Sequence, residues 1–208
     1  MSAAPFPDEQ PARQRLLAAA ITLIRRNGYA ATSVDEICRA AGVTKGAFFH
    51  HFASKERLAV AAAEHFTDMA ARWFEDAPFL ALPDPADRVL GYVDFRLSRL
   101  SDDLSQCTCL LGTLVQEAYE TSPDIRAAAF AGIARQAGGL EPDLAAALAA
   151  AGSPLDPRGV ALHTQAVLQG AFILAKAAGS IAPAVESLTH LRHYLALILG
   201  RQAEEPVA

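Results

Sequence analysis

Cysteine is scarce in this sequence, which contains three among its 208 residues. An odd number of cysteines, two of them at the C-x-C spacing of Cys107 and Cys109, does not form a disulfide framework, and a reducing compartment is the simplest setting for such a chain. The sequence does not open with the charged segment and apolar run that mark a signal peptide. No apolar run approaches the roughly 20 residues of a membrane-spanning helix. We therefore expect a cytoplasmic protein that does not enter the membrane.

Enzyme signatures are missing as well. The sequence has no G-x-S-x-G elbow, no phosphate-binding glycine loop, no H-E-x-x-H and no C-x-x-C pair. Its six histidines are scattered, and no carboxylate stands at a telling spacing from them. The C-x-C pair has no third or fourth metal ligand at a recognisable spacing. We expect neither an enzyme nor a protein that holds a cofactor or a metal ion.

Positive charge is in short supply overall, because the net charge is −5. Taken alone, that charge argues against a nucleic-acid partner, but it is unevenly distributed. Residues 1–56 carry seven Lys and Arg against five acidic residues, a net charge of +2, which leaves −7 on residues 57–208. A mildly basic N-terminal part on an acidic body is consistent with DNA binding at one end only.

Hydrophobic residues, by contrast, are plentiful at 52% of the chain, and where they recur every three or four residues they predict helices. Leu17, Ile21 and Ile24, for example, share one face of the first predicted helix. Three prolines between residues 76 and 85 predict a loop that no helix crosses. We expect an all-α fold whose helices cover residues 12–27, 34–41, 45–51, 55–75, 86–100, 109–119, 124–151 with a break near Gly138 and Pro142, 157–178 and 183–200.

Residues 32–58 have the pattern of a helix-turn-helix. Ser33 can cap the first helix, and Glu36 three residues later completes a capping box. Gly42 stands where the chain must turn, because glycine tolerates a positive φ, and Thr44 can cap the next helix. That second helix has barely two turns and is too short to be stable without its neighbours. In a helix-turn-helix, the second helix enters the major groove of DNA.

This segment resembles the DNA-binding signature of the TetR family of bacterial transcription regulators. The glycine at the turn, the H-F-x-S-K ending and the helix that restarts after Ser54 make the resemblance more specific than a helix-turn-helix alone. The residues that carry it are Thr32, Ser33, Ile37, Ala40, Ala41, Gly42, Val43, Lys45, Gly46, Phe49, His51, Phe52, Ser54, Lys55 and Leu58. The resemblance implies an N-terminal three-helix DNA-binding head and a larger helical body for ligand binding and dimerisation.

We therefore expect four parts in the chain. They are a disordered tail (1–11), a helix-turn-helix DNA-binding domain (12–54), a helical ligand-binding and dimerisation domain (55–200) and a second tail (201–208). The long helix predicted from Lys55 begins in the head and ends in the body, so we expect it to link the two mechanically.

Ten residues of the helix-turn-helix segment are candidates for contacting DNA. Hydroxyls and backbone amides at a helix start can hold a phosphate, lysine can bind a base edge or a phosphate, and apolar side chains can contact a thymine methyl group. Gly46 would let the second helix approach the duplex closely. The candidates are Thr32, Ser33, Thr44, Lys45, Gly46, Ala47, Phe48, Phe49, His50 and Lys55.

Three further points concern this short helix. We expect His51 and Phe52 to brace it from the inside, although for His50 and His51 an ordinary packed or solvated imidazole is the alternative. Many relatives carry tyrosine where this chain has Phe49, and in the family that phenol donates a hydrogen bond to a phosphate. Losing one such bond costs about 1 kcal/mol. The two lysines and His50 would then have to anchor the DNA backbone.

The resemblance also implies a small-molecule pocket in the body. Apolar and aromatic side chains would form its walls and a few polar groups would orient the ligand. The candidate residues are Phe66, Met69, Trp73, Phe95, Cys107, Cys109, Gln116, Tyr119, His163, Gln169 and Phe172. Ordinary core packing is the alternative interpretation of each of them.

The helices predicted for residues 157–178 and 183–200 carry apolar residues on more than one face. Such a helix needs two partners, one within the chain and one outside it. The resemblance implies that this pair forms a four-helix interface between two copies of the chain. An ordinary buried hairpin is the alternative.

These observations lead to one functional hypothesis with two alternatives. We expect a homodimeric repressor that a small-molecule effector releases from a near-palindromic DNA operator. The first alternative is a thiol sensor of electrophiles or oxidants, because Cys107 and Cys109 lie near a helix start, where a thiolate is favoured. The second is a helical ligand-binding or enzymatic body that has lost operator binding, for which Phe49 is the only support.

Overall fold

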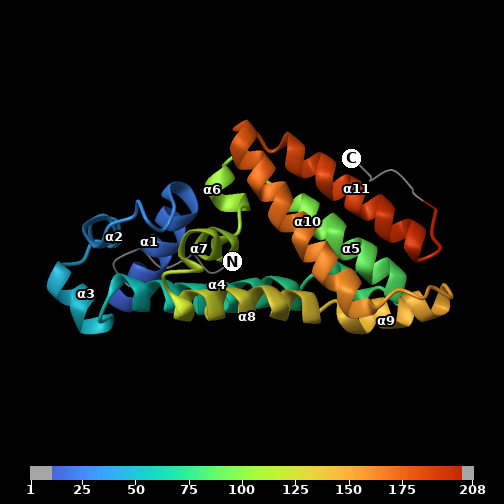
Figure 1. Ribbon diagram of the computed structural model, residues 1–208, viewed down its shortest axis with the longest axis horizontal. Helices are drawn as coiled ribbons and strands as arrows, with labels where there is room; N and C mark the ends of the chain where they lie inside the picture. Colours follow the sequence, from blue (N-terminus) through green and yellow to red (C-terminus); the bar gives the residue numbers. More distant parts are fainter. Residues whose placement is uncertain (1–10, 203–208) are drawn as a thin grey trace, which may run out of the picture. The chain divides into compact units, whose positions relative to one another are not determined.

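The structure is a computed structural model that describes residues 11–202, apart from the side chains of Gln106 and Cys107. This part of the chain is helical and contains no strand, as the sequence predicts (Figure 1). None of its helices combines the length and the apolarity that crossing a membrane requires. The elements are α1 Ala12–Asn27, α2 Val34–Ala41, α3 Lys45–His51, α4 Lys55–Glu75, η2 Pro78–Ala81, α5 Pro85–Ser98, α6 Leu104–Cys107, α7 Leu110–Ala118, α8 Pro123–Gly138, α9 Glu141–Ala150, α10 Pro157–Ala178 and α11 Ala182–Ile198.

The predicted helix bounds are confirmed closely for α1 to α4 and for α10. The predicted break also occurs, because α8 ends at Gly138 and Pro142 lies in the first turn of α9. Two short elements were not predicted. The proline-rich loop contains the 3-10 helix η2, which Pro78 opens, and Asp103 caps the single turn of α6 by accepting a hydrogen bond from the Ser105 amide at 3.0 Å.

The described residues form two compact units. Unit 1 contains the residues up to Met69 together with Cys109–Gly132, and unit 2 contains Ala70–Thr108 together with the residues from Ile133 onwards. Unit 1 is thus larger than the DNA-binding domain predicted for residues 12–54, because α7 packs against α1. The tails predicted for residues 1–11 and 201–208 lie outside the described residues, except for Pro11, Arg201 and Gln202.

The core of unit 1 is formed where α1 meets α2, α3 and α7. The apolar face predicted for α1 is buried, and Ile37 of α2 and Phe48 of α3 are fully buried with it. Leu111 and Leu114 of α7 are fully buried as well. Each of these helices therefore contributes its apolar stripe to one shared core, which is what lets the two-turn α3 exist.

In unit 2, α5 packs against η2, α9 and α11, and α10 packs against α9 and α11. Figure 1 shows α10 and α11 side by side as a hairpin. Buried side chains such as Tyr92, Leu168 and Leu191 fill the space between these helices. Arg201, the first residue of the predicted C-terminal tail, packs against the body instead. It forms an ion pair of 2.5 Å with Asp84, the residue that caps α5.

Candidate DNA-binding surface and effector cavity

The helix-turn-helix has the caps that its sequence predicts. The Ser33 hydroxyl accepts a hydrogen bond from the Glu36 amide at 3.2 Å, and the Ser33 amide donates to the Glu36 carboxylate at 2.8 Å. These contacts complete the capping box and hold the pKa of Glu36 below its ordinary value. Gly42 ends α2 in the left-handed conformation with φ 61°, and Thr44 caps α3 through the Ala47 amide at 3.1 Å.

The two adjacent phenylalanines of α3 have opposite environments. Phe48 is fully buried, whereas Phe49 is 52% exposed with its ring edge-on to Phe48 at 5.1 Å between centroids. The prediction that Phe48 contacts DNA is therefore wrong, because its ring is needed in the core beneath α3. Phe52 braces the helix from inside, as predicted, but His51 does not, because it is exposed.

The outer face of α3 keeps most of the predicted DNA contacts available. Lys45, Gly46, Phe49 and His50 are exposed, and Ala47 is half-buried. The Lys45 ammonium lies 2.9 Å from Asp35 of α2, but both side chains are about 60% exposed, at 59% and 63%. An ion pair this exposed contributes little, so Lys45 can exchange Asp35 for a phosphate or a base edge. These residues remain predictions as DNA contacts.

Three of the predicted phosphate contacts are used within the protein instead. Thr32 is almost fully buried, and its hydroxyl donates to the Gly28 carbonyl at 2.6 Å. The Lys55 ammonium donates to the carbonyls of Tyr29 at 2.9 Å and Thr32 at 3.0 Å, and it lies 4.3 Å from the Tyr29 ring centroid. The Ser33 hydroxyl donates to the carboxylate with which it forms the capping box, at 2.7 Å. These side chains fix the connection between α1 and α2.

Sequence reasoning missed a fourth group that holds this connection. Glu117 of α7 accepts a hydrogen bond from the Ala30 amide at 2.7 Å. A side chain on Gly28 would collide with this carboxylate, because a Cβ there would lie 2.5 Å from Glu117 Oε1. Gly28, which follows α1, has φ 94° and ψ 161°, a positive φ that favours glycine. Its lack of a side chain makes room for Glu117.

Two more contacts join the start of α4 to α8 within unit 1. The Ser122 hydroxyl hydrogen-bonds the carboxylate of Glu56, and Arg57 forms an ion pair of 3.2 Å with Asp124. With Glu117, they tie the helix-turn-helix to α7 and α8 through polar groups as well as through the core. The partners in these three contacts lie 87, 66 and 67 positions apart in the sequence. Helix and turn spacing rules do not reach over such separations, so the sequence alone could not predict these contacts.

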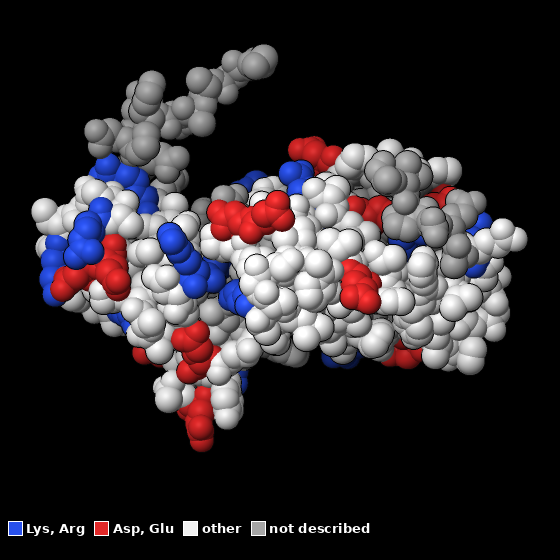
Figure 2. All heavy atoms as spheres, turned by 90° about the horizontal axis from the view of Figure 1, so that it is seen from above, with Lys and Arg blue, Asp and Glu red and all other residues white. Residues whose placement is uncertain are grey.

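Positive charge on the surface of unit 1 is mixed with negative charge. Figure 2 shows Lys and Arg side chains over α1 to α3 with acidic side chains beside them. This pattern agrees with the small net charge of residues 1–56. The guanidinium groups of Arg13 and Arg25 lie over the rings of Phe52 and Phe66 at 5.4 and 5.5 Å, so these two charges also pack against buried aromatic side chains.

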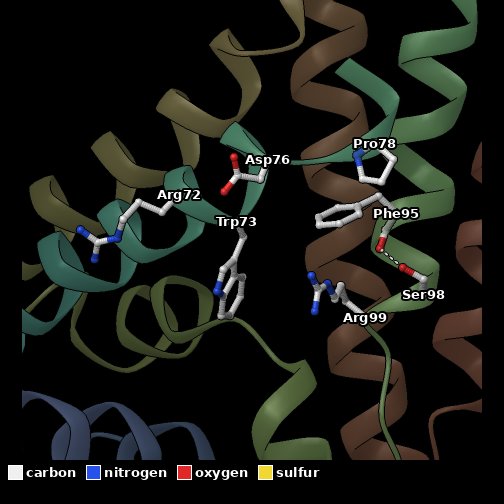
Figure 3. Close-up of a pocket in the computed structure, with 7 residues that line it drawn as sticks. All are labelled: Arg72, Trp73, Asp76, Pro78, Phe95, Ser98 and Arg99. Atoms are coloured by element: carbon white, nitrogen blue, oxygen red, sulfur yellow. Dashed lines mark hydrogen bonds between the residues drawn. The ribbon is translucent and has the colours of Figure 1, made fainter. Parts of the chain in front are cut away.

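Unit 2 contains a cavity of about 600 Å³ (Figure 3). Two of the predicted pocket residues, Trp73 and Phe95, line it. The other lining residues, which were not predicted, are Arg72, Asp76, Pro78, Ser98 and Arg99. The sequence could have predicted three of them from their spacing, because residues three and four positions apart share a face of one helix. That spacing places Asp76 beside Trp73 at the end of α4 and Ser98 and Arg99 beside Phe95 at the end of α5.

The remaining predicted pocket residues do not line this cavity. His163 packs edge-on against Tyr194, Gln169 is half-buried on α10, and Phe172 is buried under the Arg96 guanidinium. The others with a described side chain belong to unit 1. There Phe66 and Cys109 are buried, Met69 is half-buried and Tyr119 is 55% exposed. Gln116 donates a hydrogen bond to the carbonyl of Gly112 in its own helix. The side chain of Cys107 lies outside the described part of the structure.

Comparison with known proteins gives matches over the helix-turn-helix head and over most of the chain. The family model described as "Bacterial regulatory proteins, tetR family" matches residues 16–62. The transcriptional regulator AcuR of Cereibacter sphaeroides is 31% identical over 122 residues, which span 59% of this chain and 56% of AcuR. The HTH-type transcriptional repressor NemR of Escherichia coli is 28% identical over 193 residues, which span 90% of this chain and 96% of NemR.

A solved structure supports the same relationship. The crystal structure of the reduced form of E. coli NemR matches 86% of this chain and 94% of its own, with a TM-score of 0.75 and 26% sequence identity. The similarity therefore includes the body as well as the helix-turn-helix. The chain nevertheless spans little more than half the length of AcuR.

Proposed function

Because this chain belongs to the TetR family of bacterial regulatory proteins and is a DNA-binding transcriptional regulator, we propose that it is a homodimeric repressor which a small-molecule effector releases from its operator. The observation that carries the proposal is α3, a capped two-turn helix whose inner ring, Phe48, is fully buried and whose outer face is exposed. The outer side of α3 is covered by no other helix in the described part of the chain, since Lys45, Phe49 and His50 are exposed. Its outer face is suited to entering a major groove.

On this proposal the DNA contacts come from fewer groups than the sequence predicts. Lys45 binds a base edge or a phosphate, Gly46 allows close approach, and Ala47 and Phe49 contact sugar or thymine methyl groups. His50 and the exposed helix start at Thr44 contact phosphates. The buried Thr32 and Phe48 support these residues from behind, and Lys55 holds the connection before α2.

The dimer in this proposal forms through α10 and α11. Both helices bury one apolar face inside unit 2, yet they also expose large apolar side chains, among which Leu197 is 70% exposed. A second copy of the chain would cover this face. The other exposed apolar residues are Leu162, Ile173, Leu174, Val185 and Tyr194. Two heads would then read half-sites about 34 Å or a multiple of it apart.

The effector in this proposal binds the cavity of unit 2. Arg72, Trp73 and Asp76 at the end of α4 line that cavity, and α4 begins with Lys55 in the helix-turn-helix unit. Binding would change the equilibrium between two orientations of α4, and allosteric coupling of this kind typically amounts to about 1–3 kcal/mol. Such a regulator would act in the cytoplasm, and we expect no catalytic activity because its relatives are transcriptional regulators.

A thiol signal is the second candidate, since the related NemR structure is described as a reduced form. Cys109 stands at the start of α7, which agrees with the predicted position near a helix start, but it is only 8% exposed. A buried thiol reacts slowly with reagents from solution. The effector mechanism is therefore the better supported of the two.

A gel-shift titration against DNA from the region upstream of the protein's own gene tests the proposal. We expect one specific complex that Lys45→Ala abolishes without changing the mass of the dimer in solution. Arg126→Ala, which alters an exposed arginine of α8, is the matched control and should bind like the unmodified protein. Equal affinity of the Lys45→Ala and Arg126→Ala variants would refute the assignment of α3.

A further inference from the structure

The cavity of unit 2 has one aromatic surface that faces a cation. Figure 3 shows Phe95 and Arg99 projecting from α5 toward Trp73 on α4, whereas Arg72 points to the opposite side. The charged groups that line the cavity are two arginines and one aspartate, and of the two arginines only Arg99 points toward Trp73. A ligand between Trp73 and Arg99 would therefore meet a flat ring on one side and a guanidinium on the other.

Trp73 is exposed although it follows buried apolar residues of α4 at helical spacing. Its side chain is 48% exposed, while Leu58, Ala62 and Phe66 earlier in the same helix are buried. An indole left open beside a hollow offers an unoccupied planar surface, and aromatic groups prefer offset or edge-on contacts with such a surface. The opposite wall is firm, because the Phe95 ring lies 5.7 Å from Phe74 and 5.9 Å from Phe79 between centroids.

The neighbouring arginines of α5 differ in their availability. Arg96 lies over the rings of Phe74 and Phe172, at 5.9 Å from each centroid, and so belongs to the core. Arg99 lies 5.0 Å from the Phe95 centroid, and none of the ion pairs among the described residues involves it. A guanidinium presents a rigid fork of donors that matches a carboxylate in two parallel hydrogen bonds. Arg99 can therefore bind an acid without breaking an existing ion pair.

The remaining polar groups of the cavity accept hydrogen bonds. Ser98 donates its hydroxyl hydrogen to the Phe95 carbonyl at 2.8 Å, so only its lone pairs remain for a ligand. Asp76 is an acceptor when it is ionised. An acidic ligand that also carries a hydroxyl or amino donor at a distance from its carboxylate would satisfy both kinds of site.

From these contacts we propose that the cavity binds a planar, aromatic or conjugated carboxylate, with its ring against Trp73 and its carboxylate on Arg99. The volume of about 600 Å³ is within the range of small-molecule pockets. A cationic ligand is disfavoured because Arg99 faces the same space. The inference rests on the proposed function only for the consequence of binding, which is release of DNA; the ligand class follows from the cavity itself.

Trp73 is the only tryptophan of the chain, so fluorescence excited at a wavelength that tryptophan absorbs and tyrosine does not reports on this cavity. We propose to titrate the full-length protein with benzoate and, as matched probes, with benzamide and benzylammonium, which keep the ring and change the charge. Benzoate should change the Trp73 emission saturably and bind about tenfold more tightly than benzamide, because a charge-assisted hydrogen bond replaces a neutral one. Equal affinity of benzoate and benzamide, or tighter binding of benzylammonium, would overturn the proposal.

Two variants locate the effect. Arg99→Gln should lower benzoate affinity to that of benzamide, whereas Arg158→Gln, which alters an exposed arginine of α10 in the same unit, should leave it unchanged. If Arg99→Gln binds benzoate as tightly as the unmodified protein, the assigned carboxylate site is wrong.

DNA binding is measured separately, in the presence and absence of saturating benzoate. A fluorescence response together with weaker operator binding supports both the ligand class and its regulatory role. A response with unchanged operator affinity refutes the regulatory role, and operator binding without any response to benzoate refutes the ligand class while the proposed function stands.

Discussion

Removing the Glu117 carboxylate should weaken DNA binding although Glu117 is outside the helix-turn-helix. In the structure it accepts the Ala30 amide at 2.7 Å, immediately before the segment that Thr32 and Lys55 also hold. A hydrogen bond to a charged group contributes about 1.5–3 kcal/mol when it is shielded, and about 0.5–1.5 kcal/mol is usual for a neutral bond. This bond is exposed, so water can replace the carboxylate. We therefore expect a loss near 1 kcal/mol for Glu117→Ala, which is about a fivefold change in an equilibrium constant.

The loss should be visible in two measurements. Fluorescence anisotropy with a labelled operator duplex should show about fivefold weaker binding, and thermal unfolding followed by circular dichroism should show a lower midpoint. Glu117→Gln keeps an amide oxygen as an acceptor, so we expect an intermediate effect. Glu120→Ala is the control, because it removes an exposed carboxylate three residues later for which no contact is seen among the described residues. If the Glu117→Ala and Glu120→Ala variants have the same operator affinity, the idea that α7 positions the helix-turn-helix is refuted.

Further substitutions test neighbouring parts of the surface. Gly28→Ala should destabilise unit 1 by about 1–3 kcal/mol, because it places a Cβ at a positive φ and against the Glu117 carboxylate; an unchanged unfolding midpoint would contradict this. Asp35→Asn should strengthen operator binding at low salt, since it removes the negative charge beside Lys45, and the gain should shrink as salt is added. Phe49→Tyr should tighten operator binding about fivefold in the same anisotropy assay, because the hydroxyl added to this exposed ring can donate a hydrogen bond worth about 1 kcal/mol to a phosphate; unchanged affinity would contradict a phosphate contact at this position. N-Ethylmaleimide should label Cys38 and Cys109 much more slowly in the folded protein than in denaturant, since both are buried, and mass spectrometry of digested samples would show it.

The part of the head that could be predicted from sequence is the part determined by local spacing. The capping box of Ser33, the turn at Gly42 and the cap at Thr44 each depend on residues within four positions of one another, and all three are confirmed. The orientation of α3 was harder to predict from the sequence. Phe48 and Phe49 are adjacent and chemically identical, so only the packing of α3 against α1 and α2 decides which ring is buried.

Contacts between distant residues account for the rest. Lys55 has the residue type of a phosphate ligand, yet two carbonyls 26 and 23 residues away occupy its ammonium group. Glu117 matches no capping or spacing rule that would link it to Ala30, which lies 87 positions away in the sequence. In the body, the family resemblance together with residue type led to the prediction of Trp73 and Phe95 as cavity residues. Neither gave a reason to choose Arg99 over Arg96, because that choice depends on the Arg96 guanidinium lying over the rings of Phe74 and Phe172.

Sequence-specific DNA binding through α3 is the central claim. Its most direct test is a competition titration at physiological salt, in which the protein binds a labelled duplex from its own upstream region and is challenged with the same duplex or a scrambled one. The account predicts a preference of about a thousandfold or more for the native sequence, as specific regulators show, with two chains bound to each near-palindromic site. Equal competition by the scrambled duplex would contradict it.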